Sequence, residues 1–408
     1  MVKEWPKSPI GEILDFKNGL NKGKEFFGFG TPIVNYTDVY HNSGIKAEDV
    51  KGKVFLSKEE IRRFEVRKND VFFTRTSETP EEVGLSAVLL EDIQDCVFSG
   101  FVLRGRPKND KLVGEYCKYC FSTKHVREEI IKNCTYTTRA LTNGKVLSAI
   151  EIPVPLKEEQ TEIANVLSSF EQYIDDLAEL IEKKKGIRDG ALEDLITKKT
   201  RLDGCAGDWT PVTFNQVITP KARIGWQGLK KHEYLRSGYS YLIGGTDFSN
   251  GTVSLDNISY VTKERYDMDT NIQVSENDVL VTKDGTIGKV AIVPELSKPA
   301  TLNSGVFVFR TNSRLVPAFL FRVLQSSVFR EFIDTLSAGS TIKHLYQKDL
   351  KKFEFEIPID TKEQEAIAAV LKAMDEEIRD LETERDKIIQ IREGAMDDLL
   401  MGRIRLIK

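Results

Sequence analysis

A segment of about fifty residues occurs twice in this chain of 408 residues and constrains its fold more than any other feature. The first copy begins at Ile152 and reads IPVPLKEEQTEIANVLSSFEQYIDDLAELIEKKKGIRDGALEDLITKKTRL. The second begins at Ile357 and reads IPIDTKEQEAIAAVLKAMDEEIRDLETERDKIIQIREGAMDDLLMGRIRL. The register holds throughout when Gln160 is aligned on Gln364. Because the copies are about half a chain apart, the repeat indicates a duplicated domain plus helix and not a solenoid.

Apolar residues recur along both copies in alternating steps of four and three. Steps that average 3.5 residues keep one seam against a partner helix, which is the pattern of a coiled coil. Each copy predicts a helix of about 40 residues, about 60 Å long at 1.5 Å per residue. The other copy is the obvious partner; two separate surface helices, each packed on its own domain, are the alternative. The seams are Ile163, Leu167, Phe170, Ile174, Leu177 and Ile181, and then Ile367, Leu371, Met374, Ile378, Leu381 and Ile388.

Composition excludes several classes of protein. Hydrophobic residues make up 40% and charged residues 30%, which suits a globular protein with long charged helices. No run of about 18 apolar residues exists, and the first residues lack an apolar signal core, so we expect a cytoplasmic protein without a membrane span. Five cysteines without framework spacing predict free thiols. Cys117 and Cys120 form one C-x-x-C; zinc is an alternative there, but buried thiols are favoured because no second ligand pair follows.

The net charge of −4 is unevenly distributed. Residues 1–150 hold 24 Lys and Arg against 21 Asp and Glu, and residues 206–355 hold 18 against 15. The two helical segments together hold 17 against 27. The globular parts are therefore mildly basic and suited to DNA, whereas the acidic helices suit a protein partner or water.

Two similar domains of α/β (α+β) class are predicted in front of the helices. Short apolar runs rich in Val and Phe indicate strands at 71–76, 86–90 and 101–105, and helical spacing follows from 113 to about 133. Residues 206–355 repeat this order weakly. The predicted organisation is a first domain at 1–155, a helix at 156–203, a second domain at 204–356 and a second helix at 357–408.

Two glycines at equivalent positions, Gly190 and Gly394, interrupt the helices. Each costs about 1 kcal/mol against Ala, so we expect close approach by the sister helix or a docked subunit, with a tolerated kink as the alternative. Catalytic motifs are absent. There is no G-x-x-x-x-G-K-[ST], no N-P-P-Y or D-P-P-Y, and no metal or nucleophile spacing among the four histidines.

The order of parts resembles the specificity subunit of type I restriction-modification systems. In that family two target-recognition domains are each followed by a long helix that starts with a P-x-x-x-Q-x-x-I-A-x-x-L-type motif. The strand and loop NDVLVTKDGTIGKVAIV (Asn277–Val293) and the loop GSTIKHL (Gly339–Leu345) also resemble the family. The first domain departs from this pattern, with TRTSETPEEVG in place of the D-G-T-I-G loop. The helix starts that match are Pro153 and Pro155 to Gln160, Ile163, Ala164 and Leu167, and Pro358 to Gln364, Ile367, Ala368 and Leu371.

The resemblance implies a non-catalytic protein. Each domain would read one half of a bipartite, asymmetric target in double-stranded DNA. The two helices would lie antiparallel, set the gap between the halves and hold two methyltransferase subunits, to which translocase-nuclease subunits are added. No cofactor is expected in this chain; S-adenosylmethionine, ATP and Mg are expected on the partner subunits.

A protein that reads DNA needs cations for phosphates and forked or amide side chains for base edges. A basic loop containing Gly, a strand end and a later polar loop supply such residues in each half. For any one of them, solvated surface charge is the alternative. The candidate DNA-binding residues are Lys17, Asn21, Lys22, Lys24, Arg75, Thr76, Ser77, Thr138 and Arg139 in the first domain, and Arg223, Lys230, Lys231, Lys283, Asp284, Thr286, Ser340, Thr341 and Lys343 in the second.

Two rival functions follow from the same pattern. A protein-interaction scaffold could carry two binding domains on an acidic coiled-coil spacer. The targeting part of a single-chain methyltransferase is the third hypothesis, and the absence of catalytic motifs counts against it.

Overall fold

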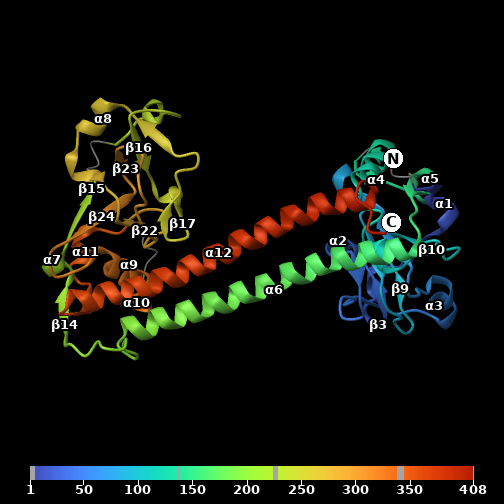
Figure 1. Cartoon of the computed structure of the whole chain (residues 1–408), viewed down its shortest axis with the longest axis horizontal. Coiled ribbons are helices and arrows are strands. Elements are labelled where there is room, and N and C mark those ends of the chain that lie inside the picture. The colour runs from blue at the N-terminus through green and yellow to red at the C-terminus, as the bar shows by residue number, and fades with distance from the viewer. Residues whose placement is uncertain (1–4, 137, 224–227, 338–343, 408) are drawn as a thin grey trace. The chain divides into compact units, whose positions relative to one another are not determined.

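The computed structural model describes residues 5–136, 138–223, 228–337 and 344–407. The chain folds as two compact units, of which unit 1 comprises Met1–Ala178 with Thr383–Lys408 and unit 2 comprises Glu179–Glu382. Each unit contains one α/β domain and half of each long helix (Figure 1). The units therefore cut across the linear segments of the sequence, because both helices contribute to both units.

The two long helices are α6 (Lys157–Ile196) and α12 (Thr361–Leu400), with 40 residues each. Within each unit the two helices run antiparallel, as the pairing of residue numbers shows. In unit 1 the Tyr173 hydroxyl donates to Glu384 at 2.6 Å. In unit 2 Lys184 pairs with Glu377 at 2.5 Å and Lys185 with Glu382 at 2.9 Å. The buried positions of the predicted seams include Ile163, Leu167, Leu177 and Ile181 on α6, and Ile367, Leu371 and Ile378 on α12.

A buried glutamine fastens the start of each helix to its own domain. The Gln160 side chain accepts from the Val113 N–H at 2.8 Å and donates to the carbonyls of Lys111 and Pro155 at 2.8 and 2.9 Å. Gln364 repeats this arrangement in unit 2, accepting from the Val316 N–H at 2.8 Å and donating to two carbonyls. Because all the polar atoms of these amides have partners, their burial costs little, and each amide ties the helix start to its own domain.

A second cluster, Trp–Glu–Arg, joins the end of one helix to the start of the other in each unit. In unit 1 Glu159 accepts from Arg405 at 2.6 and 2.7 Å and from the Trp5 indole at 3.1 Å. In unit 2 Glu363 accepts from Arg201 at 2.9 Å and from the Trp209 indole at 3.1 Å. The same three residue types therefore perform the same task at both junctions.

The domain of unit 1 is built on a five-stranded sheet in the order β2-β10-β6-β8-β4. A hydrophobic core joins one face of this sheet to the first turns of α6 and the last turn of α12. The sheet strands are β2 (Leu14–Asn18), β10 (Val102–Pro107), β6 (Val71–Thr74), β8 (Ser86–Leu89) and β4 (Gly44–Ile45). The remaining strands are β1 (Lys7–Pro9), β3 (Phe27–Val34), β5 (Lys53–Val54), β7 (Thr76–Ser77), β9 (Val97–Phe98), β11 (Thr135–Tyr136), β12 (Ala140–Leu141) and β13 (Glu151–Pro153), and the helices are α1 (Ile10–Ile13), η1 (Lys24–Phe26), α2 (Tyr36–His41), α3 (Lys58–Phe64), η2 (Pro80–Glu82), η3 (Glu115–Lys118), α4 (Lys124–Asn133) and α5 (Gly144–Ala149).

The domain of unit 2 repeats this plan with a six-stranded sheet in the order β15-β24-β21-β22-β18-β17. Its core likewise includes residues of α6 and α12. The sheet strands are β15 (Ile218–Ala222), β24 (Val306–Thr311), β21 (Val279–Thr282), β22 (Val290–Ile292), β18 (Thr252–Val253) and β17 (Phe248–Ser249). The other elements are β14 (Trp209–Thr213), β16 (Ser240–Ile243), β19 (Ser259–Val261), β20 (Gln273–Val274), β23 (Ala300–Leu302) and β25 (Glu354–Pro358), with α7 (Phe214–Val217), η5 (Lys231–Glu233), η6 (Gly245–Asp247), α8 (Lys263–Asp267), η7 (Thr270–Ile272), α9 (Pro317–Gln325), α10 (Ser327–Ser337) and α11 (Gln347–Leu350).

The register of the central strands is the same in both domains. Thr74 of β6 lies opposite Val102 of β10, and Thr282 of β21 lies opposite Val306 of β24. The predicted fold class, with two similar domains each followed by a long helix and the helices antiparallel, is therefore confirmed.

Two local expectations are corrected. The helix expected from 113 to 133 is split into η3 and α4, because the Thr123 side chain caps a new helix start by accepting from the Val126 N–H. A Cβ built on Gly190 or Gly394 would meet no atom within 4 Å, so the expected close approach of the sister helix is not observed, while approach by a docked subunit stays a prediction.

Candidate nucleic-acid interface

In unit 1 three loops meet at one end of the main sheet, where β2 and β6 end and β10 begins. The Gly100 N–H donates to the Leu20 carbonyl at 2.7 Å, and the Arg75 N–H donates to the Phe101 carbonyl at 3.0 Å. The segment that follows strand β12 joins them through the Thr142 N–H, which donates to the Arg75 carbonyl at 3.0 Å. Four segments that are far apart in the sequence therefore present one continuous surface.

Two candidates of the first domain, Arg75 and Asn21, lie on this surface, and three more, Lys24, Thr138 and Arg139, lie in the segments that lead to or from it. Arg75 is half-buried, and its guanidinium lies 3.4 Å from the Gly100 carbonyl. A Cβ on Gly100 would come within 2.2 Å of the Asn21 amide oxygen, so this glycine makes room for Asn21. Lys24, Thr138 and Arg139 are exposed.

The other candidates of the first domain have structural partners. Lys17 donates to the Arg63 carbonyl, and burial, followed by the nearby guanidinium of Arg104, lowers the pKa of its ammonium group. Lys22 forms an ion pair with Glu60 at 2.7 Å, and its hydrogen bond lowers the pKa of that carboxyl to about 2. Ser77 is buried and donates to Glu82, while Thr76 pairs with β12 as part of β7. Ser77 is therefore removed from the surface that DNA could reach.

Unit 2 repeats the backbone frame of this surface with different side chains. The Lys283 N–H donates to the Gly305 carbonyl at 2.9 Å, and the Leu345 N–H donates to the Lys283 carbonyl at 2.8 Å. Asp284, which stands where the first domain has Thr76, contacts the His344 imidazole through its carboxylate. Thr286 is exposed, and its carbonyl accepts from the Thr282 hydroxyl at 2.5 Å.

The remaining candidates of the second domain are divided. Lys230 and Lys231 are exposed at the start of η5. Arg223 is only 2% exposed and donates to the Leu302 carbonyl at 3.0 Å, so it lies inside the domain and we leave it out of the DNA-contacting set. Ser340, Thr341 and Lys343 lie outside the described residues.

Sequence reasoning overlooked the exposed aromatic residues of these surfaces. Phe101 is 61% exposed and lies directly beside Arg75, while Tyr136 of β11 is exposed close to Arg139. In unit 2 the exposed Tyr234 donates to the Asn303 side chain at 3.3 Å, and Tyr346 packs against His344 with ring centroids 4.6 Å apart. In the folded domains the backbone role of Phe101 is performed by Gly305 in unit 2, so the fold does not require an aromatic side chain there.

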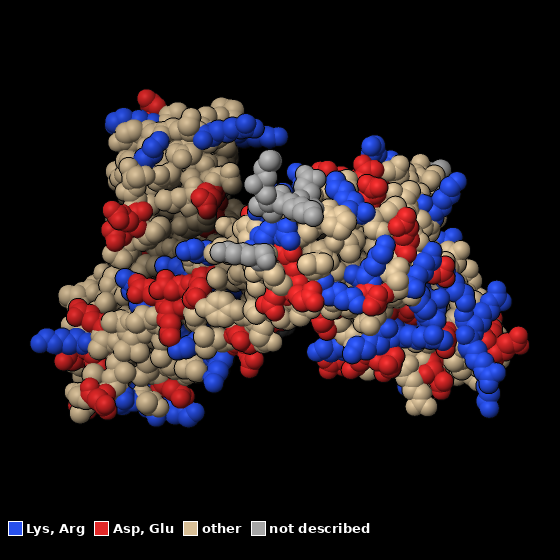
Figure 2. Space-filling view, turned by 45° about the vertical axis from the view of Figure 1, so that its right-hand side comes forward, with Lys and Arg blue, Asp and Glu red and all other residues tan. Residues whose placement is uncertain are grey.

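Lys and Arg side chains, with Asp and Glu among them, cover the domain of unit 1 on the right of Figure 2. Among the described residues no group of three or more His, Cys, Asp or Glu is placed to hold a metal ion. All five cysteines are free thiols, and Cys117 and Cys120 are buried. Within the described part of the chain, no helix has the length and apolarity to cross a membrane.

A duplicated α/β domain with a shared frame and divergent loops, joined to two long antiparallel helices, is the architecture of a two-domain recognition protein. The family model described as "Type I restriction modification DNA specificity domain" matches residues 2–185 and again residues 208–391. The chain belongs to this family, that of the specificity subunits of type I restriction-modification systems.

Relatives and solved structures agree with this assignment. The chain is 25% identical over 425 residues to the type I restriction enzyme MjaVIII specificity subunit of Methanocaldococcus jannaschii, covering 99% of this chain and 94% of the relative. It is 26% identical over 251 residues to the EcoBI specificity subunit of Escherichia coli, covering 56% and 52% of the two chains. The fold is similar to the crystal structure of the S subunit from M. genitalium, with a TM-score of 0.55 at 17% identity over 97% of this chain and 96% of that one. A structure from a study of complex assembly in the type I system gives a TM-score of 0.63 at 14% identity over 98% of both chains.

Proposed function

We propose that each domain of this chain reads one half of a split, asymmetric sequence in double-stranded DNA, and that the paired helices set the gap between the halves. The observation that carries the proposal is the common frame with different side chains. Equivalent backbone bonds present Arg75, Thr76 and Phe101 in unit 1, but Lys283, Asp284 and Gly305 in unit 2. Two surfaces with the same backbone frame and different side chains suit two different half-sites.

The chemistry of the side chains supports direct readout of bases. Arg and Lys pair with guanine O6 and N7 or with phosphates, and a carboxylate such as Asp284 accepts from the amino group of cytosine. Apolar side chains such as Phe101 contact the thymine methyl group or enter a base step. We thus predict an apolar contact with DNA from Phe101 in unit 1, and a polar contact from Asp284 in unit 2.

We further propose that the chain does no chemistry itself and acts in the cytoplasm within a larger complex. The acidic helices suit a protein partner better than phosphate. Two methyltransferase subunits would dock there, with translocase-nuclease subunits joining the assembly. S-adenosylmethionine, ATP and Mg would be bound by those partners.

A map of adenine methylation in the host genome, with and without the gene for this chain, tests the proposal. We expect methylation to disappear at one asymmetric split motif, which would also give the target. Unchanged methylation in a host that expresses the partner subunits would reject it.

The alternative, a protein scaffold, makes a different prediction about salt. Binding of a DNA duplex that contains the mapped motif should weaken steeply between 50 and 200 mM salt, because phosphate contacts release counterions. A scaffold should show no salt-dependent binding of DNA and should retain protein partners.

A further inference from the structure

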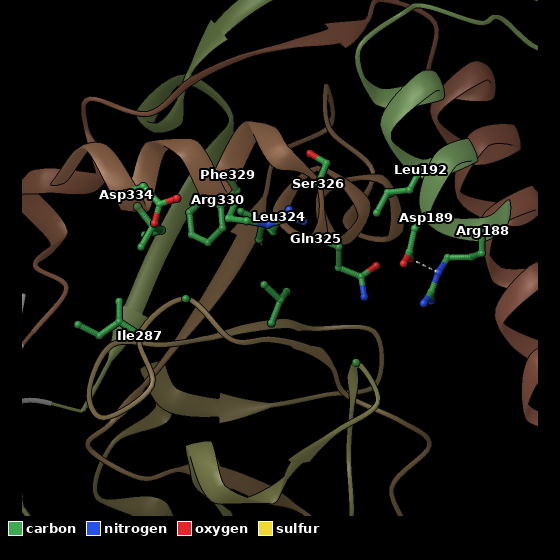
Figure 3. A pocket seen from close by; sticks show the side chains of 14 residues that line it. Arg188, Asp189, Leu192, Ile287, Leu324, Gln325, Ser326, Phe329, Arg330 and Asp334 are labelled. Carbon is green, nitrogen blue, oxygen red and sulfur yellow. Dashed lines mark hydrogen bonds and ion pairs between the residues drawn. The ribbon is translucent and has the colours of Figure 1, made fainter. Parts of the chain in front are cut away.

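A pocket of about 460 Å³ lies in unit 2 between α6, the junction of α9 and α10, and the loop that follows β21 (Figure 3). Its apolar walls include Ile287, Phe329 and Ile333, and Arg330 stands at its edge. On the α6 side, Asp189 is already paired with Arg188 at 2.7 Å. None of these contacts is used by the DNA-reading surface described above.

The first domain fills the corresponding place with its own chain. In both domains the last threonine of the central strand donates to a carbonyl across the loop: Thr74 to Glu82 at 2.7 Å, and Thr282 to Thr286 at 2.5 Å. Between these fixed points, the five residues Ser77–Glu81 stand where the second domain has only Gly285. The longer loop includes the turn η2, which packs on α4, the counterpart of α10.

The residues around this loop show what it supplies to unit 1. The Arg127 guanidinium donates to the Glu81 carbonyl at 2.7 Å, and the Tyr40 hydroxyl donates to Glu82 at 3.1 Å. Val83 and Ile130 are fully buried. The loop therefore provides a carbonyl for an arginine, and the apolar side chains of Val83 and Ile130 beside it are covered in unit 1.

The counterparts in unit 2 lack this cover. Arg330 is the counterpart of Arg127, and its side chain is 67% exposed with Glu193 3.9 Å away. Ile287 and Ile333, the counterparts of Val83 and Ile130, are only partly buried and line the pocket. Unit 2, which has the shorter loop, therefore has an arginine beside partly open apolar walls.

We propose that the pocket of unit 2 is a docking site for a loop of the methyltransferase subunit, and that this loop supplies in trans what Ser77–Glu82 supplies in cis to unit 1. The occupant would place an apolar side chain against Ile287 and Ile333 and a carbonyl or carboxylate against Arg330. Asp334, one turn along α10 from Arg330, also lines the pocket. Naming the methyltransferase as the partner rests on the proposed function.

Because unit 1 fills this place itself, the two methyltransferase copies are held unequally. The copy on unit 2 gains the pocket contacts, and the copy on unit 1 does not. Loss of the pocket contacts should therefore weaken one of the two binding events and spare the other.

Native mass spectrometry of the chain with purified methyltransferase subunit from the same host tests the inference. We expect the wild-type chain to bind two copies. Arg330→Ala should weaken one binding event about tenfold, and Ile333→Trp, which fills the pocket, should weaken the same event at least as much. Lys351→Ala, an exposed lysine on the same domain outside the pocket, is the matched control and should bind both copies normally.

The outcomes separate this inference from the proposed function. Thermal unfolding of each variant checks that the domain is intact, and binding of the DNA target is measured in parallel. Two equally bound copies in both pocket variants would overturn the docking site while leaving DNA reading intact. A wild-type chain that binds DNA but no methyltransferase would overturn it as well.

Discussion

Arg75 and Lys283 follow equivalent strands, β6 and β21, in the two domains, and their backbones make equivalent hydrogen bonds. Replacing either by Ala should leave the frame intact, because only the side chain is removed. If a cation contacts a base edge, its loss should cost about 1–3 kcal/mol and relax one position of one half-site; if it contacts phosphate, all sequences should bind more weakly alike. Titration of a panel of single-base variants of the target measures the difference.

The two variants act as controls for each other. Arg75→Ala should affect only the half-site read by unit 1, and Lys283→Ala only the other. Unchanged affinity and selectivity in both variants would reject the assignment of these loops.

Phe101 offers a sharper test, because the second domain already has a different residue at the equivalent position. Phe101→Gly introduces the residue found at the equivalent position in unit 2, so the melting temperature should stay within about 2 °C, since exposed sites have small effects on stability. Affinity for the first half-site should fall about tenfold if the ring contacts bases, equal to about 1.4 kcal/mol.

Phe55→Ala is the matched control for Phe101. Phe55 is a comparably exposed phenylalanine of the same domain, but it follows strand β5 directly and stacks on Phe29 of strand β3 instead of lying among the loops. Equal losses of affinity in the two variants would indicate a general effect of removing exposed aromatic rings, and would count against a base contact by Phe101.

The candidate residues were predicted from residue type and position after a strand, and this explains which of them lie at the surface and which do not. Arg75 and Lys283 could be located because a strand end fixes where the next residue lies. The burial of Ser77 and Arg223 could not, because it depends on Glu82 and Leu302, whose proximity arises only in the folded domain. Phe101 was missed because a search for cations and amides ignores apolar side chains.

At the scale of elements, the long helices were predictable because both copies carry the same seam in the same register. Their partners were predictable for the same reason, since an apolar seam without cover is unstable in water. The break between η3 and α4 was not, because the apolar spacing of residues 113 to 133 continues across the Thr123 cap. The side-chain cap at Thr123 therefore starts a new helix, although the apolar spacing continues across it.

The helices lead to a prediction about spacing. Four residues inserted near the middle of α6 or α12 would lengthen that helix by about 6 Å, which is about two base pairs of DNA. We expect the gap in the methylated motif to change by one or two base pairs, with both half-sites unaltered. Methylation mapping of the variant measures this, and an unchanged gap would mean that the helices do not set the distance.

At the scale of the whole molecule, stability depends on the junctions that close each unit. Glu159 is almost fully buried and is held by Arg405 and Trp5, which come from the two ends of the chain. Glu159→Gln should lower the free energy of unfolding by about 2 kcal/mol at pH 7, because the charged hydrogen bonds to Arg405 are weakened. Chemical denaturation measures the loss.

The pH dependence of this effect has a definite sign. Hydrogen bonds from Arg405 lower the pKa of Glu159 in the folded protein. The stabilisation is therefore complete above the unfolded value of about 4.3, and is lost as the pH falls through the folded pKa. The difference between wild type and Glu159→Gln should shrink below about pH 4, and a constant difference down to pH 2 would show that the ion pair is not its source.

The loop between Thr282 and Thr286 is anchored at both ends by the same hydrogen bond that anchors its longer counterpart in unit 1. Between the anchors the first domain has seven residues and the second has three, because Ser77–Glu81 stand where the second domain has only Gly285, while the sheet register is the same. Evolution can therefore exchange this stretch as a cassette, and a lineage could acquire a new target or a new partner without rebuilding the domain. Engineers could graft other loops between Thr282 and Thr286.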